Sequence, residues 1–291
     1  MIPVQRQFES AGLRINAWEW PAEGKPIVLL IHGGRDQARS WDFIADRLVG
    51  QFHIVAPDLR GHGDSAWSGE GQYDLVDFVS DSASVLTALP SPVHLVGHSL
   101  GGNIALRLAA IYTDRVERLV AIEGLELPLT REAASETKPL ADRFRSWLDQ
   151  RQAREERSPP VYPTIAAAAD RMAREFPQLD RAMIDHLALH SVRPVDGGFT
   201  WKFDNRTRLR PPMDSDSRDF DLLLDGISCP TLLLYGGNSW VPAPDPDRLA
   251  RIRDHRISRY EDAGHWLHHD YPDRFAANVV SFLSNKETAY A

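Results

Sequence analysis

The chain contains 291 residues, 43% of them hydrophobic, and carries a formal net charge of −8 at pH 7. This size and apolar content suffice for one large domain that carries an insertion. The excess of acidic residues argues against nucleic acid as a partner, because a phosphate-binding surface is normally basic. The net charge alone does not identify the charge of a small-molecule substrate.

Cysteine content and hydropathy bear on where the protein resides. Cys229 is the single cysteine of the chain, so an intramolecular disulfide is excluded. The first residues lack the apolar core of a signal peptide, and no apolar stretch approaches the length of a membrane span. The sequence therefore predicts a soluble, cytoplasmic protein without a membrane partner.

Strand-like and helix-like segments alternate along most of the chain, which is typical of a parallel sheet covered by helices on both faces. In chain order, strands are expected at 5–10, 13–20, 27–31, 52–56, 92–97, 116–122, 230–236 and 257–260. Helices are expected near 41–49, 75–89, 102–110, 246–252 and 273–283. The sequence thus predicts the α/β class with a mostly parallel sheet.

The segment 125–221 differs from the rest. It is rich in Arg, Glu and Ala with helical spacing, and is interrupted by Pro159-Pro160 and Pro211-Pro212. We therefore expect residues 1–124 and 222–291 to form a core domain and residues 125–221 to form a helical cap. A cap over the site would exclude water and influence substrate choice.

The most informative segment is Gly97-His98-Ser99-Leu100-Gly101, which ends an apolar strand-like run. Glycines on both sides of a serine permit a sharp turn from strand to helix, because larger side chains would collide with neighbouring backbone. The turn lifts the hydroxyl of Ser99 clear of the sheet, beside the amides of a helix N-terminus, where negative charge is favoured. By itself the motif also fits a serine in an ordinary tight turn.

Two further segments favour a catalytic interpretation of Ser99. The strand expected at 27–31 is followed by His32-Gly33-Gly34, a loop of the kind that supplies a backbone donor to an oxyanion hole. His265 follows a later strand near the C-terminus, in the order that a serine, acid and histidine triad requires.

Together these motifs make the chain resemble the α/β-hydrolase-fold family of esterases, lactonases, carbon–carbon bond hydrolases and haloalkane dehalogenases. The resemblance covers nearly the whole chain. It rests on His32-Gly33-Gly34, the run Pro-Asp-Leu-Arg-Gly-His-Gly-Asp-Ser at 57–65, the Ser99 motif continued by Gly102, and Gly264-His265.

The resemblance implies an α/β-hydrolase fold, with an eight-stranded sheet flanked by helices and a helical cap inserted after the sixth strand. It implies a serine hydrolase with Ser99 as nucleophile and His265 as general base. The amides of Gly34 and Leu100 would form the oxyanion hole. A small molecule is then the expected substrate.

The acid of such a triad is not at its usual place. Members of the family usually hold an Asp in the loop after the seventh strand, but here Ser239 stands at that position. A serine has no negative charge with which to orient a histidine and stabilise its imidazolium. Some members place the acid at the end of the sixth strand, where this chain has Glu123. A carboxylate there is costly to desolvate unless a group such as His265 pairs with it.

Other interpretations of the acid stay open. Glu123 could instead begin the connection into the cap and pair with an arginine. Asp245 and Asp247 follow the loop of Ser239, but their pattern is that of a helix start. Asp225 precedes the seventh strand and lies too early in the chain.

Residues beside these motifs are expected to line the substrate pocket. Gly33, Arg35 and His98 adjoin the oxyanion loop and the nucleophile, while Trp240 and Trp266 adjoin the loop of Ser239 and the histidine. Arg35 could meet a substrate carboxylate, although an exposed arginine is the simpler interpretation. Large aromatic residues are also common in protein cores.

His268 and His269 resemble metal ligands only superficially. Adjacent residues point in different directions on a helix, and no third ligand accompanies them at a useful spacing. We therefore expect no metal and no cofactor.

The sequence favours hydrolysis of a carboxylic ester or lactone of a small, partly apolar substrate through an acyl-enzyme on Ser99. A serine nucleophile disfavours the dehalogenase and epoxide-hydrolase reactions, which proceed through an alkyl ester of an aspartate. Cleavage of a carbon–carbon bond next to a ketone, acyl transfer, perhydrolysis and noncatalytic ligand binding are the alternatives. The acyl group, the leaving group and the oligomeric state are not determined by the sequence.

Overall fold

The computed structural model describes residues 2–126, 139–209, 211 and 217–285. Its main feature is a sheet of eight strands in the order β1-β2-β4-β3-β5-β6-β9-β10. The strands are β1 (Val4–Ser10), β2 (Leu13–Trp20), β3 (Ile27–Ile31), β4 (His53–Pro57), β5 (Val93–His98), β6 (Val116–Ile122), β9 (Thr231–Gly236) and β10 (His255–Tyr260).

The sheet is parallel from β4 to β10, while β2 runs antiparallel to both β1 and β4. Strands β5 and β9 are buried at every position, because helices cover both faces of the sheet. The edge strand β1 has mostly exposed or half-buried side chains. The predicted mostly parallel sheet is confirmed.

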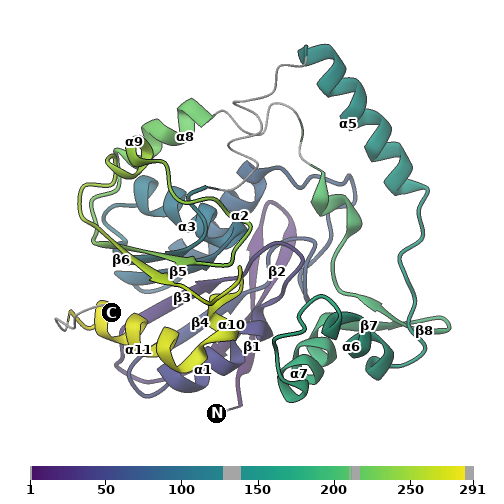
Figure 1. Ribbon diagram of the computed structural model, residues 1–291, viewed down its shortest axis with the longest axis horizontal. Helices are drawn as coiled ribbons and strands as arrows, with labels where there is room; N and C mark the ends of the chain where they lie inside the picture. Colours follow the sequence, from purple (N-terminus) through teal and green to yellow (C-terminus); the bar gives the residue numbers. More distant parts are fainter. Residues whose placement is uncertain (1, 127–138, 210, 212–216, 286–291) are drawn as a thin grey trace.

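Helices divide between the two faces of the sheet (Figure 1). On one face lie α2 (Leu75–Ala88), α3 (Leu100–Ile111) and α8 (Ser217–Leu224); on the other lie α1 (Asp42–Leu48) and α11 (Pro272–Leu283). Each face has its own apolar core, because successive strand side chains point to opposite faces. Leu95 packs in the core beneath α3, whereas Val96 packs in the core beneath α11.

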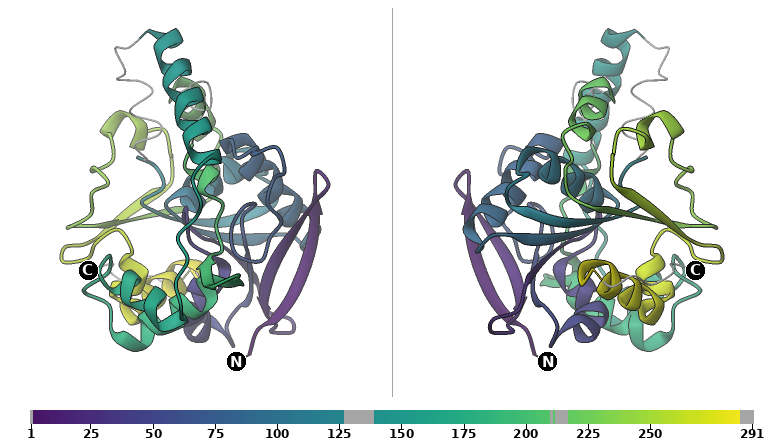
Figure 2. Two further views of the ribbon diagram at one scale, coloured as in Figure 1. Left: turned by 90° about the vertical axis from the view of Figure 1, so that its right-hand side faces the viewer. Right: turned by 90° about the vertical axis from the view of Figure 1, so that its left-hand side faces the viewer.

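An insertion separates β6 from β9. Its described elements are α5 (Leu140–Glu155), α6 (Ile165–Ala173), α7 (Arg181–Ser191), β7 (Val192–Val195), β8 (Gly198–Trp201) and the short 3-10 helix η2 (Asn205–Arg208). Helix α5 projects away from the sheet as an arm (Figures 1 and 2). Helices α6 and α7 pack together around Ala169, Ile184 and Ala188.

The insertion contains the helices α5, α6 and α7 and also the antiparallel hairpin of β7 and β8, which we did not predict. Asp196 and Gly197 form its turn, and Gly197 and the following Gly198 have positive φ values of 81° and 145°. This Asp-Gly pair between two short strands is the sequence signal for the hairpin. Helix α8 packs on α3, so the expected cap boundary at residue 221 falls within a helix that contacts the core.

The parallel strands end at one edge of the sheet, where the loops after β3, β5, β6, β9 and β10 gather. These loops carry the candidate catalytic residues of the sequence. Ligands bind at such an edge in open parallel sheets. None of the helices in the described part of the chain is both long and apolar enough to cross a membrane.

A substitution at Gly101 tests how closely α3 packs against the sheet. A Cβ atom at Gly101 would lie 2.1 Å from the carbonyl oxygen of Ile31, and backbone cannot yield as a flexible side chain can. We expect Gly101→Ala to lower the free energy of unfolding by at least about 3 kcal/mol in denaturant titrations. Gly69→Ala is the control, because nothing lies within 4 Å of its added Cβ. Equal unfolding midpoints for the two variants would contradict this account.

Candidate active site

Ser99 lies at the turn between β5 and α3, with φ of 52° and ψ of −115°. This backbone conformation is strained for a residue with a side chain, and such strain is commonly found at functional sites. The turn is held by a 2.7 Å hydrogen bond from the Ser99 amide to the Ile122 carbonyl and by a 3.0 Å bond from the Asn103 amide to the Ser99 carbonyl. A Cβ at Gly97 would lie 2.3 Å from the Gly101 oxygen, so glycine is required there.

Glu123 follows β6 directly and is fully buried. Its Oε1 accepts a 2.8 Å hydrogen bond from the Gly236 amide, and its Oε2 accepts a 2.6 Å bond from Ser239 Oγ. The same Oε2 is hydrogen-bonded to Nδ1 of His265. A buried carboxylate is tolerated only when donors replace its lost hydration, and these contacts do so.

Ser239 is a residue of the site that we did not predict. It occupies the place where an Asp was expected, yet its hydroxyl donates to Glu123 instead of substituting for it. Its oxygen also accepts a 3.1 Å hydrogen bond from the Val241 amide, which orients the hydroxyl. The sequence signal was its position in the loop after β9, which reaches the same sheet edge as Glu123.

The other candidate acids have different partners. Asp245 accepts hydrogen bonds from the amides of Asp247 and Arg248 and caps the short helix α9 (Pro246–Leu249). Asp225 forms a 2.7 Å ion pair with Arg251. Glu123 is therefore the carboxylate that the structure brings to His265.

His265 lies in a buried aromatic setting at the start of the last helical region. Its ring centroid is 4.5 Å from that of Trp240, 4.6 Å from that of His98 and 4.8 Å from that of Trp266. His98 Nε2 also makes a 2.9 Å hydrogen bond with the His265 carbonyl. Burial and the neighbouring His265 keep the pKa of His98 well below its ordinary value, so His98 is neutral near pH 7.

Ser99 and His265 lie in one site because His98, the residue before Ser99, contacts the ring and the carbonyl of His265. The hydrogen bonds of the described residues do not include one between Ser99 Oγ and His265. Hydrogen bonds between catalytic groups often form fully only when substrate binds. Gly33 completes the packing, because a Cβ there would lie 2.8 Å from His98 Nδ1 and 3.4 Å from Ser99 Cβ.

A cavity of about 800 Å³ lies against Gly34 and Trp266, which directly follow Gly33 and His265 in the chain, and its lining includes neither Ser99 nor His265. Gly34, Arg35 and Asp36 of the loop after β3 line it from the core, and Trp266 lines it beside His265. Residues of α5, α6, α7, β8 and η2 line it from the insertion. Its size is that of a typical small-molecule site.

Three of the predicted pocket residues are not part of the cavity lining. The lining does not include Gly33, His98 or Trp240. Gly33 and His98 are buried, while Trp240 is largely exposed and contacts the His265 ring. Leu100 begins α3 with a buried side chain, which places its amide at the helix N-terminus next to Ser99.

Asp36 is a second residue of the region that the sequence did not single out. Its Oδ1 accepts a 2.8 Å hydrogen bond from the Gln37 amide, and the residue is part of the cavity lining. Burial raises the pKa of Asp36 to about 7. The carboxyl therefore gives up much of its negative charge around neutral pH.

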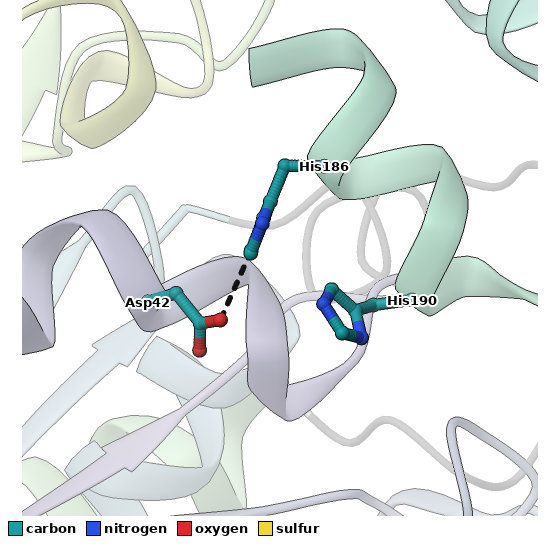
Figure 3. Close-up of side chains that lie close together, drawn as sticks. All are labelled: Asp42, His186 and His190. Atoms are coloured by element: carbon teal, nitrogen blue, oxygen red, sulfur yellow. Dashed lines mark ion pairs between the residues drawn. The ribbon is translucent and has the colours of Figure 1, made fainter. Parts of the chain in front are cut away.

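One group of side chains has the composition of a metal site: Asp42 on α1 with His186 and His190 on α7 (Figure 3). Both oxygens of Asp42 already accept 2.8 Å hydrogen bonds from Arg39 Nε, and His186 Nε2 lies 3.0 Å from Asp42 Oδ2. The Arg39 charge opposes a cation at this place. We interpret the group as an ion-pair network that holds α7 against α1.

Comparison with known proteins identifies the family. The model of the alpha/beta hydrolase family matches residues 28–278, and the chain belongs to that family. It is 31% identical to an esterase of Mycobacterium tuberculosis, over 94% of this chain and 87% of the relative. It is 28% identical to the sn-1-specific diacylglycerol lipase of Mus musculus, over 89% of this chain and 81% of the relative.

Among solved structures, the thioesterase domain from the curacin biosynthetic pathway is similar over 97% of this chain and 100% of that chain. The two have a TM-score of 0.85 and 26% sequence identity. The α/β-hydrolase fold expected from the motifs is thereby confirmed.

The burial of His268 predicts how the stability of the protein depends on pH. It lies on the short helix α10 (Leu267–Asp270), stacks on Trp41, and burial holds its pKa well below 6.5. The unfolded chain therefore binds a proton near pH 6.5 that the folded protein does not, so stability falls as the pH falls below 6.5. When the pH is lowered from 7 to 5, the free energy of unfolding should decrease in both proteins. The decrease should be about 2 kcal/mol smaller for His268→Phe than for the wild type. Parallel pH profiles in denaturant titrations would contradict this.

Proposed function

We propose that the protein is a serine hydrolase that cleaves a carboxylic ester or lactone of a small, partly apolar substrate. The contact between buried Glu123 and His265, at the sheet edge where Ser99 occupies a strained turn, carries the proposal. The relatives named as an esterase and a lipase support ester cleavage as the reaction.

In the proposed mechanism, His265 accepts the Ser99 proton as the hydroxyl oxygen attacks the ester carbonyl carbon. Glu123 holds the Nδ1 proton of His265, which leaves Nε2 free to act as the base. The amides of Gly34 and Leu100 stabilise the oxyanion, and each donor contributes about 10²- to 10³-fold to the rate in comparable sites. The carbon–oxygen bond then breaks, and the alcohol leaves with the proton from His265.

The acyl group remains on Ser99 and is released by water. His265 takes a proton from the water molecule as its oxygen attacks the acyl carbon, and returns the proton to Ser99 Oγ as that ester bond breaks. The carboxylic acid is the second product. The same residues would serve a carbon–carbon bond hydrolase, so the choice between the two reactions depends on which substrates the cavity admits.

We propose that the insertion acts as a cap that selects the substrate. It supplies most of the cavity lining, including Tyr162, Met172, Phe176, Trp201 and Phe203. These side chains give the cavity an apolar part. A closed cap would also exclude water while the acyl-enzyme forms.

The acid assignment is tested by Glu123→Gln. An amide cannot stabilise the imidazolium of His265, so we expect kcat for p-nitrophenyl butyrate to fall by about 10²- to 10⁴-fold, with an unchanged circular dichroism spectrum. Ser99→Ala should abolish labelling by a fluorophosphonate probe. Asp245→Asn is the control and should retain wild-type kcat, because asparagine also caps a helix well. Near-normal turnover by Glu123→Gln would overturn the assignment.

The reaction class is tested with the same wild-type protein. Turnover of short p-nitrophenyl esters that disappears in Ser99→Ala supports the ester assignment. Turnover of a vinylogous 1,5-diketone without ester turnover would instead establish carbon–carbon bond cleavage.

Ser239 is expected to act through Glu123 as a positioning residue. Removing its hydroxyl in Ser239→Ala leaves Glu123 Oε2 with His265 as its remaining donor. We expect kcat to fall about tenfold, because a hydrogen bond to a charged group contributes about 1.5–3 kcal/mol, while KM stays nearly constant. Ser239→Thr retains the hydroxyl and should restore most of the activity. Equal kcat values for Ser239→Ala and the wild type would rule out this role.

A further inference from the structure

Arginine side chains gather in the cavity that Gly34 and Trp266 line. Its lining includes five arginines, which are Arg35, Arg154, Arg157, Arg171 and Arg208. They come from separate parts of the chain: the loop after β3, the end of α5 and the residues after it, α6 and η2. The cavity wall is thus rich in positive charge, although the whole chain has a net charge of −8.

Carboxylates of the lining do not balance this charge. Glu175 pairs with Arg171 at 2.8 Å. Asp36 is the other lining acid, and burial raises its pKa to about 7, which leaves it partly protonated at neutral pH. The lining therefore contains two acids and five arginines, and one of the acids is already paired.

Three of the arginines have no acidic partner among the described residues. These are Arg35, Arg157 and Arg208, for which the structure gives no ion pair. A fourth, Arg154, donates a 3.3 Å hydrogen bond to the Asn205 carbonyl, which is a neutral acceptor. Desolvation and the charges of Arg35, Arg154 and Arg157 lower the pKa of Arg208, and the opposite charge of Glu175 only partly offsets them. The guanidinium groups therefore repel one another.

We propose that this arginine cluster, Arg35, Arg154, Arg157 and Arg208, binds an anionic group of the ester substrate, a carboxylate or a phosphate. A bound anion relieves the repulsion between the guanidinium groups, and the planar guanidinium fork fits both anions through paired hydrogen bonds. This inference rests on the proposed ester hydrolysis and adds a substrate class to it.

The position of the cluster places the anion relative to the reacting bond. Arg35 follows Gly34 directly in the chain, at a positive φ of 65° that is uncommon for a residue with a side chain. The anion would therefore lie on the cap side of the oxyanion loop. Apolar side chains of the same cavity, such as Phe176 and Trp266, would contact the part of the substrate between the anion and the ester.

Matched esters test the preference and locate the anion. On the acyl side, p-nitrophenyl hemiglutarate is compared with p-nitrophenyl pentanoate; on the leaving-group side, 5-butyryloxy-2-nitrobenzoate is compared with p-nitrophenyl butyrate. We expect kcat/KM to favour the charged ester at least about tenfold in one of the two pairs. Raising the salt concentration should reduce this preference. Equal kcat/KM within both pairs would overturn the proposal.

Substitutions in the arginine cluster then test whether the cluster causes the preference for charged esters. Arg208→Gln should lower the ratio of charged to neutral kcat/KM about tenfold, and Arg208→Lys should retain part of it. Arg14→Gln, an exposed arginine on β2 outside the cavity lining, is the matched control and should keep the wild-type ratio. An Arg208→Gln variant that slows both esters equally would show a structural role and overturn the proposal.

Binding without turnover separates this proposal from the proposed reaction. Calorimetry on Ser99→Ala with glutarate and with inorganic phosphate should detect binding that Arg208→Gln weakens about tenfold. Such binding would support the anion site even if ester turnover did not depend on Ser99. Absence of binding for both anions, with Ser99-dependent turnover of p-nitrophenyl butyrate intact, would overturn the anion site and leave ester hydrolysis standing.

Discussion

The arrangement of the sheet edge depends on one buried charge. Glu123 is fully buried at the end of β6, and its carboxylate takes donors from Gly236, Ser239 and His265. Those donors lie on two segments, the end of β9 with the loop after it and the loop before α10, and both are far from Glu123 in the sequence. Displacing either segment would leave part of a carboxylate unsatisfied in an apolar interior, which is strongly unfavourable. The charge thereby fixes the position of His265 relative to the sheet.

Close backbone packing supports the same edge. Ser99 and Glu123 both have positive φ, at 52° and 49°, where adjacent strands β5 and β6 end. A Cβ at Gly124 would lie 2.4 Å from the Gly102 carbonyl carbon, so the chain after β6 passes directly against the start of α3. Small residues here allow two strained turns to stand side by side. The strain is held by the buried strands on which the turns are built.

Charge is distributed unevenly over the molecule. The chain as a whole is acidic, whereas the cavity between core and insertion is lined by arginines. Net charge governs solubility and long-range attraction, but a ligand in a cavity responds to the groups that line it. A net charge of −8 was therefore compatible with a site suited to anions.

The sequence by itself determined the fold, because buried strands, amphipathic helices and the glycines around Ser99 are local patterns in the chain. It also singled out Glu123, since a carboxylate that ends an apolar strand needs a partner. The contact between Ser239 and Glu123, the β7–β8 hairpin on the insertion and the grouping of Arg35 with Arg208 appeared only in the tertiary structure. Such contacts join residues distant in the sequence, and their geometry depends on how the insertion and loops pack against the sheet.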